Sequence, residues 1–174
     1  MKGIDFQKTT FTPAEAEAIT GVNVVQQRNL RRHGYLPKTP KGMTRFKIDG
    51  SAGLLVTGKL AERGIPPSTS TGIAKSAGVL ILLFAQDVSG AIADPENLAQ
   101  GEKPIKYQTG MRKRFLIAYG KSKNEFSFEN DLTAFYVGKR DADLTAAIVL
   151  DLQRLAETLC ERAGGPLWRV VEAT

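Results

Sequence analysis

The sequence predicts an α+β protein, with short helices in its N-terminal part and a small antiparallel sheet packed by a long helix towards its C-terminus. Three observations support this fold class. Two helix-start signals follow each other between residues 12 and 34, the apolar pattern becomes typical of strands after residue 104, and a helical apolar stripe fills residues 141–162. We expect three segments, at residues 1–68, 69–104 and 105–174.

The first helix is expected to begin at Pro13. Thr12 can cap it, and the side chain of Glu15, three positions later, can return a hydrogen bond to the backbone of the cap. Gly21 is expected to end this helix, because glycine readily adopts the left-handed conformation that follows many helices.

A second helix is expected from its cap at Asn23 to Gly34. With two residues between the helices, they must cross steeply, which is how a helix-turn-helix offers its second helix to the major groove of DNA. Arg can pair with guanine, and Asn or Gln with adenine. The expected DNA-facing residues of this helix are Val25, Gln26, Arg28, Asn29 and Arg32. The alternative is an ordinary solvated polar face.

A basic loop follows the second helix. Pro37, Pro40 and Gly42 punctuate it, as in a hairpin wing that touches phosphates. His33, at the end of the second helix, is expected to contact a phosphate or to cap the helix. The residues expected to bind the DNA backbone are Arg31, Lys38, Lys41, Arg45 and Lys47.

Residues 12–67 resemble the N-terminal DNA-binding domain of the MerR class of bacterial regulators. The shared features are the helix opening at Thr12, Ile-Thr-Gly-Val-Asn at residues 19–23, Arg-Arg-His-Gly-Tyr-Leu-Pro at 31–37, Arg-Phe at 45–46 and Leu-Ala-Glu-Arg-Gly-Ile at 60–65. The resemblance implies a winged helix-turn-helix that binds DNA as a dimer.

The sequence also departs from this family. Arg28, Asn29 and Leu30 stand where the family usually carries an Arg-Tyr-Tyr triplet. The long coiled-coil helix and the cysteine metal loop that follow the domain in many members are not visible. The resemblance therefore does not extend to metal sensing or multidrug sensing.

The positive charge lies in the N-terminal part of the chain. Residues 1–68 contain 11 Lys and Arg against 5 Asp and Glu, whereas residues 69–174 contain 13 of each kind. Cationic residues displace counterions from phosphates, so this asymmetry favours nucleic acid as the partner. A membrane surface would require a strongly amphipathic basic helix, and the second helix is too short for that role.

The composition argues against a membrane protein, a metalloprotein and an enzyme. The chain has 174 residues, of which 42% are hydrophobic, enough for one or two domains with real cores. We expect no apolar run long enough to span a membrane, and no signal peptide is visible, so we expect a cytoplasmic protein. One cysteine and one histidine form no metal cluster and no nucleophile–base pair. We therefore expect no metal, no cofactor and no catalysis.

The remaining helices and strands follow from periodicity. Helices are expected at residues 51–63 and 72–88, with a strand at 78–84 as the alternative for the apolar half of the second. Strands are expected at 105–109, 113–119, 125–128 and 134–137. Residues 1–11 are expected to be held loosely, and residues 167–171 could add a strand.

The long helix at residues 141–162 is expected to cover the sheet, although its stripe could also form a dimer seam. The stripe consists of Leu144, Ile148, Leu152, Leu155 and Leu159. Cys160 lies beside it and is expected to be a buried small hydrophobe rather than a redox sensor. A set of aromatic residues is expected to form the sheet core, with an effector pocket as the alternative. These are Phe126, Phe128, Phe135, Tyr136 and Trp168.

Together these observations predict a sequence-specific transcription regulator that binds double-stranded DNA as a homodimer, with residues 105–174 dimerising or sensing an unknown effector or protein. Two alternatives are open. One is an excisionase-like or architectural protein that bends DNA during recombination. The other is a ligand- or protein-binding module with secondary DNA binding.

Overall fold

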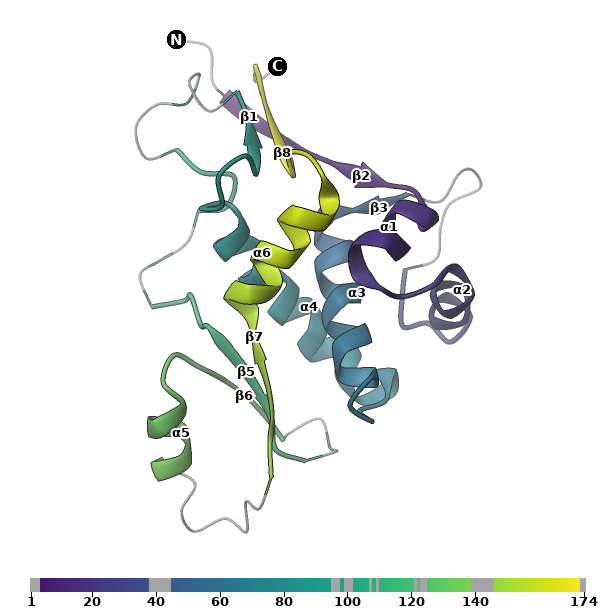
Figure 1. The fold of residues 1–174 in the computed structure, drawn as a ribbon, viewed down its shortest axis with the longest axis vertical. Helices are drawn as coiled ribbons and strands as arrows, with labels where there is room; N and C mark the ends of the chain where they lie inside the picture. Colours follow the sequence, from purple (N-terminus) through teal and green to yellow (C-terminus); the bar gives the residue numbers. More distant parts are fainter. Residues whose placement is uncertain are drawn as a thin grey trace.

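The computed structural model describes residues 4–37, 45–94, 98, 102–106, 108, 110–120, 122, 125–138 and 146–172. Within these residues it has the mixed α+β architecture that the sequence predicts (Figure 1). The helices are α1 (Pro13–Thr20), α2 (Val24–Arg32), α3 (Ile48–Ala61), α4 (Pro67–Ala85), α5 (Leu132–Gly138) and α6 (Leu152–Ala163). The strands are β1 (Ile4–Lys8), β2 (Thr10–Phe11), β3 (Phe46–Lys47), β4 (Ile92–Ala93), β5 (Phe115–Ala118), β6 (Phe126–Glu129), β7 (Ile148–Asp151) and β8 (Trp168–Glu172).

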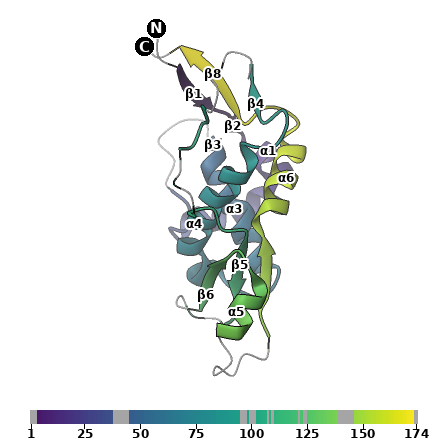
Figure 2. The ribbon, with the colours of Figure 1, turned by 90° about the vertical axis from the view of Figure 1, so that its left-hand side faces the viewer.

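Helices α3 and α4 lie side by side in the centre of the molecule (Figures 1 and 2). Their backbones approach so closely that a Cβ atom added to Gly78 would lie 2.8 Å from the backbone nitrogen of Gly53. A larger residue at position 78 would therefore push the helices apart. Both helices match predicted ones, but each begins several residues earlier than expected. The alternative of a strand at residues 78–84 is wrong, because this stretch lies within α4.

Helix α4 is unusually apolar. By length and composition it could cross a membrane, with a mean hydropathy of 1.4, which corrects the expectation that no apolar run is long enough. Half of this stretch is buried inside the protein. A central helix of a soluble protein has the same properties, because it must bury more than one side.

The two ends of the described chain pair with each other in one sheet (Figure 2). Strand β1 is antiparallel to β8, with Ile4 opposite Glu172 and Lys8 opposite Trp168, and β4 joins the other edge of β8 in parallel. Trp168, the first residue of β8, is fully buried. The expectation of a loosely held N-terminus is therefore wrong for residues 4–8, whereas the strand expected at 167–171 is confirmed.

A second sheet has the order β6-β5-β7, with both pairs antiparallel. Strands β5 and β6 lie where strands were predicted, at residues 113–119 and 125–128. The other two predicted strands are wrong. Residues 134–137 belong to α5, and the described residues of 105–109 (105, 106 and 108) carry no strand.

Helix α6 is shorter than the predicted helix at residues 141–162. Residues 148–151 form β7 instead, and the side chain of Asp151 accepts hydrogen bonds from the backbone N–H groups of Gln153 and Arg154, which starts the helix at Leu152. Leu144 lies outside the described residues. The apolar face of α6 packs mainly against α4 and α1, and it also touches β5. The expectation that this helix mainly covers the sheet is therefore wrong, because most of its contacts are with other helices.

The hydrophobic core is continuous across the predicted segment boundaries. It includes Phe11 in β2, Leu55 in α3, Leu82 in α4, Leu116 in β5 and Leu159 in α6. One face of the second sheet belongs to this core, so the three predicted segments share a single hydrophobic cluster.

Candidate nucleic-acid interface

Helices α1 and α2 are joined by a short turn, and capping residues fix the ends of both helices. Thr12 and Glu15 form the predicted capping box, with a hydrogen bond of 2.6 Å from the Thr12 N–H to the Glu15 carboxylate. Hydrogen bonds from the backbone and side chain of Thr12 lower the pKa of Glu15. Gly21 ends α1 in the left-handed region, at φ 76°. Asn23 then caps α2 as predicted, and Gln26 completes a second capping box.

Gln27 holds the two helices together. Its side chain is fully buried, and Nε2 donates hydrogen bonds of 2.9 Å to the carbonyl oxygen of Pro13 and of 2.8 Å to that of Val22. The carboxylate of Glu17 in α1 also accepts a hydrogen bond of 3.1 Å from the backbone N–H of Val24. The orientation of α2 therefore depends on side-chain to backbone contacts from both helices.

Sequence reasoning missed the roles of Glu17 and Gln27. A signal for Gln27 was present, since it lies between Val24 and Leu30 on the side of α2 that faces inward. A polar residue inside such a stripe often satisfies buried backbone groups.

The outward face of α2 carries four of the predicted DNA-facing residues. Val25 is 63% exposed, and Arg28, Asn29 and Arg32 are also exposed. Positions 25, 28 and 32 lie on one side of the helix because their spacing follows the helical period. Helix α2 lies at the edge of the molecule, away from the second sheet (Figure 1). This face is thus accessible to a large partner.

Gln26 and Arg31 make contacts within the protein. The side-chain amide oxygen of Gln26, Oε1, accepts a hydrogen bond of 3.0 Å from the backbone N–H of Asn23. The Arg31 guanidinium lies over the ring of Phe46, 4.5 Å from its centroid. Burial lowers the pKa of Arg31. Arg31 therefore links α2 to β3, whereas it was expected to bind the DNA backbone.

His33 lies at the C-terminal end of α2, at the predicted cap position. Its backbone N–H donates to the carbonyl oxygen of Asn29 at 3.0 Å. The exposed imidazole ring stacks against the ring of Tyr35, with centroids 6.1 Å apart.

Strand β3 follows the basic loop, but its partner differs from that of a wing hairpin. It pairs with β2, which precedes α1, through Thr10 opposite Lys47 and Phe11 opposite Phe46. Residues 35–37, just before the loop, carry no strand among the described residues. Lys38 and Lys41 lie outside the described residues, so the winged arrangement is not seen in the described part of the chain.

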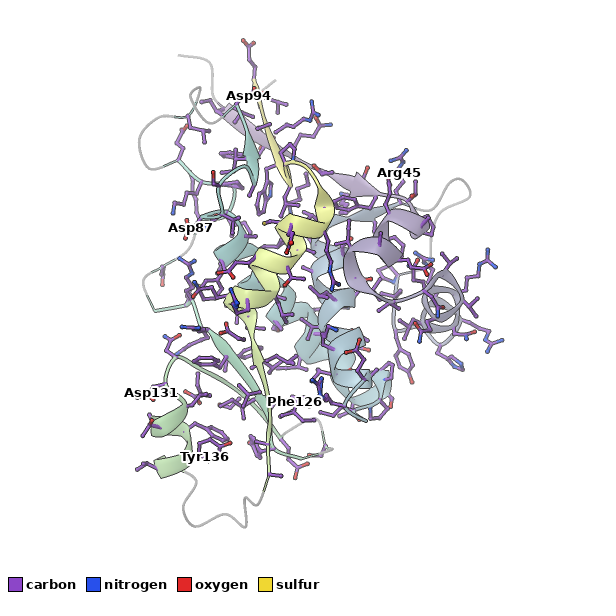
Figure 3. All side chains as sticks on the ribbon, in the orientation of Figure 1. Arg45, Asp87, Asp94, Phe126, Asp131 and Tyr136 are labelled. Atoms are coloured by element: carbon purple, nitrogen blue, oxygen red, sulfur yellow. The ribbon has the colours of Figure 1, made fainter. Side chains whose placement is uncertain are left out.

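The two described cations after the loop are exposed. Arg45 projects beside β2, where its Nη1 donates to the Thr10 hydroxyl at 3.5 Å (Figure 3). Lys47 lies next to the first residue of α3. Arg45 and Lys47 flank Phe46, the residue whose ring Arg31 of α2 covers.

The expected aromatic core is confirmed at four of five positions. Phe135 and Trp168 are buried, and Phe126 and Phe128 pack against the core. Tyr136, by contrast, is 46% exposed on α5 (Figure 3).

Charged groups also meet away from α2. The Asp87 carboxylate accepts hydrogen bonds from Lys103 at 2.5 Å and from Arg112 at 2.6 Å. Burial acts to raise the pKa of Asp87, but these hydrogen bonds outweigh burial and lower it. Arg112 also covers the ring of Phe84 at 4.0 Å. Among the described residues, no group of three or more His, Cys, Asp or Glu side chains is placed to hold a metal ion.

No model of a known protein family matches this chain, and no curated protein matches it.

Proposed function

We propose that this protein binds double-stranded DNA through the outward face of α2. The observation that carries the proposal is the exposure of Arg28, Asn29 and Arg32 on a helix whose orientation is held by buried Gln27. A helix fixed in this way presents its side chains to the major groove without further ordering. Arg and Asn are the residue types that pair with guanine and adenine.

The charge distribution supports the same proposal. Residues 1–68, which include α1, α2 and α3, carry the whole excess of positive charge. Exposed Arg45 and Lys47 would bind phosphates beside the groove that α2 enters. Lys38 and Lys41 are proposed to do the same.

Within the class of DNA-binding proteins, we propose a cytoplasmic, sequence-specific transcription regulator that acts as a homodimer. Side chains that read base edges favour sequence-specific binding over general packaging of DNA. The MerR-like winged helix-turn-helix and the dimer rest on the resemblance of residues 12–67, and residues 105–174 are proposed to supply the dimer contact. A symmetric dimer would recognise two half-sites related by a two-fold axis.

The test compares three substitutions that each remove one positive charge. Arg28→Ala should weaken binding to the specific site by about 1–3 kcal/mol and relax the preference at one base pair. Lys47→Ala should weaken specific and random DNA alike and reduce the salt slope by about 1. Arg154→Ala, on α6, is the matched control and should leave both affinities unchanged.

Fluorescence anisotropy with labelled duplexes at two salt concentrations measures these effects. If Arg28→Ala and Lys47→Ala cause equal losses on specific and random DNA, the proposed division between base reading and backbone binding is wrong. If Arg154→Ala causes the same loss, α2 is not the interface.

A further inference from the structure

A cleft of about 480 Å³ lies between α2 and α3, next to the outward face of α2. Asn29 and His33 of α2 form one wall, and Ala61 and Glu62 at the end of α3 form the other. This volume is within the range of about 300–1,000 Å³ that is common for sites of small molecules in proteins.

The surface of the cleft is mostly apolar and partly aromatic. Val22, Leu30, Ala61 and Pro67 contribute apolar surface. The rings of His33 and Tyr35 stack beside it with an angle of 26° between their planes. A planar ring system can stack on the face of an aromatic ring, so these two rings offer stacking partners to a flat ligand.

The floor of the cleft is rigid. A Cβ atom added to Gly58 would lie 2.7 Å from Cγ2 of Val22, so the turn between α1 and α2 packs directly on α3. The same turn is held by the hydrogen bond from Gln27 to the Val22 carbonyl oxygen. The cleft is therefore formed before any ligand enters, which lowers the entropic cost of binding.

The charges around the cleft favour an uncharged ligand. Among the described residues that line it, there is no Lys or Arg, and Glu62 is the one carboxylate. That carboxylate accepts hydrogen bonds of 2.9 and 3.1 Å from Lys59, one turn earlier in α3. A DNA phosphate would find no cation here, and a cationic ligand would have to compete with Lys59.

We propose that this cleft binds an uncharged, planar aromatic molecule. Its ring system would lie against His33 and Tyr35 and on the apolar floor. The Asn29 amide, which offers both a donor and an acceptor, would bind a polar group at the edge of the ring. This site shares Asn29 with the proposed DNA-binding face, but binding of a ligand to it can be tested without DNA.

The direct test is a titration of the DNA-free protein with Nile red, an uncharged planar dye whose fluorescence rises in apolar surroundings. Ala61→Trp fills the cleft from an exposed position, and Ala18→Trp makes the same change on the exposed side of α1. We expect saturable binding to the unsubstituted protein and to Ala18→Trp. Binding to Ala61→Trp should be at least about tenfold weaker.

Ala61→Arg is a second cleft variant, which adds a charge in place of an aromatic ring and should also weaken dye binding. Circular dichroism checks the fold of each variant. If the unsubstituted protein does not bind Nile red saturably, or if both Ala61 variants bind it as well as Ala18→Trp does, the proposal is wrong.

The regulatory consequence rests on the proposed function. Asn29 lines the cleft and also belongs to the set proposed to face DNA, so an occupied cleft should weaken specific DNA binding. Saturating Nile red should reduce the affinity of the unsubstituted protein for its specific duplex and should not affect that of Ala61→Trp. If the protein binds the dye but no DNA, the proposed function fails and the cleft proposal stands.

Discussion

Replacement of Gln27 by glutamate should make the stability of the protein depend on pH in a specific way. Gln27→Glu keeps the size of the side chain but replaces the donor Nε2 with an oxygen. That donor lies 2.9 Å from the Pro13 carbonyl oxygen and 2.8 Å from the Val22 carbonyl oxygen, and the position is fully buried. A carboxylate there would face two acceptors without water, so the protonated acid is favoured in the folded protein.

The magnitude follows from these contacts. The protonated acid can donate one of the two hydrogen bonds, so at low pH the substitution should cost about 1 kcal/mol. Burial raises the folded-state pKa of the new carboxyl above its unfolded value of about 4.3. Stability is therefore lost as pH rises between these two values, by about 1.4 kcal/mol per pH unit. With a folded-state pKa above about 7, as fully buried glutamates can have, the additional loss from pH 5 to pH 7 should be about 3 kcal/mol.

Urea unfolding followed by circular dichroism at pH 5 and pH 7 measures this effect as a difference from the unsubstituted protein. Gln26→Glu is the matched control, because Gln26 is exposed and occupies the position of a capping box where glutamate is favoured. The control should lose no stability between the two pH values. An equal cost of Gln27→Glu at pH 5 and pH 7 would show that Gln27 is not buried against these carbonyl groups.

Three further predictions concern other parts of the fold. Gly58→Ala should destabilise the protein by about 1–3 kcal/mol, because the new Cβ would lie 2.7 Å from Val22 Cγ2. In urea unfolding, the double variant with Val22→Ala should lose less stability than the sum of the two single losses, and purely additive losses would contradict this contact. Burial raises the pKa of Cys160 to about 11 from 9.0, so iodoacetamide at pH 8 should alkylate it about 100-fold more slowly in the folded protein than in urea, and equal rates would refute its burial. Because the folded-state pKa of Asp87 is lowered, its ionised carboxylate stabilises the protein above the unfolded pKa of 3.8, and this stabilisation is lost as pH falls through the folded-state pKa. Melting curves from pH 6 to pH 3 should therefore show a smaller loss of stability on acidification for Asp87→Asn than for the unsubstituted protein, and an equal loss would contradict this contribution of Asp87.

The helices of the N-terminal part could be predicted because their ends are set by local chemistry. Thr12, Glu15, Gly21 and Asn23 act within a few residues of their own position, and the structure has each in its expected role. Such signals do not depend on the rest of the fold.

The predictions of secondary structure were wrong where tertiary contacts decide between a helix and a strand. Residues 148–151 fit a helical stripe, yet they form β7 because β5 pairs with them, Leu116 opposite Leu150. Residues 134–137 are rich in strand-forming types, yet Phe135 packs from α5 against Tyr119, with ring centroids 5.6 Å apart. A short apolar run cannot distinguish these outcomes by itself.

In the candidate site, too, local features could be predicted from the sequence and tertiary contacts could not. The exposure of Arg28 and Arg32 follows from helical periodicity and could be predicted. The position of Arg31 over Phe46 and the hydrogen bonds of Gln27 could not, because they depend on how β3 and α1 pack on α2. The α2–α3 cleft is likewise formed by segments that are distant in the sequence.

The most direct test of the central claim is the selection of binding sites from a randomised pool of DNA duplexes, followed by titration of the selected site at two salt concentrations. We expect a two-fold symmetric sequence, with an affinity that falls steeply as salt increases. Tandem direct repeats would contradict the dimeric regulator and favour a recombination protein. No enrichment of any sequence would contradict DNA reading by α2 altogether.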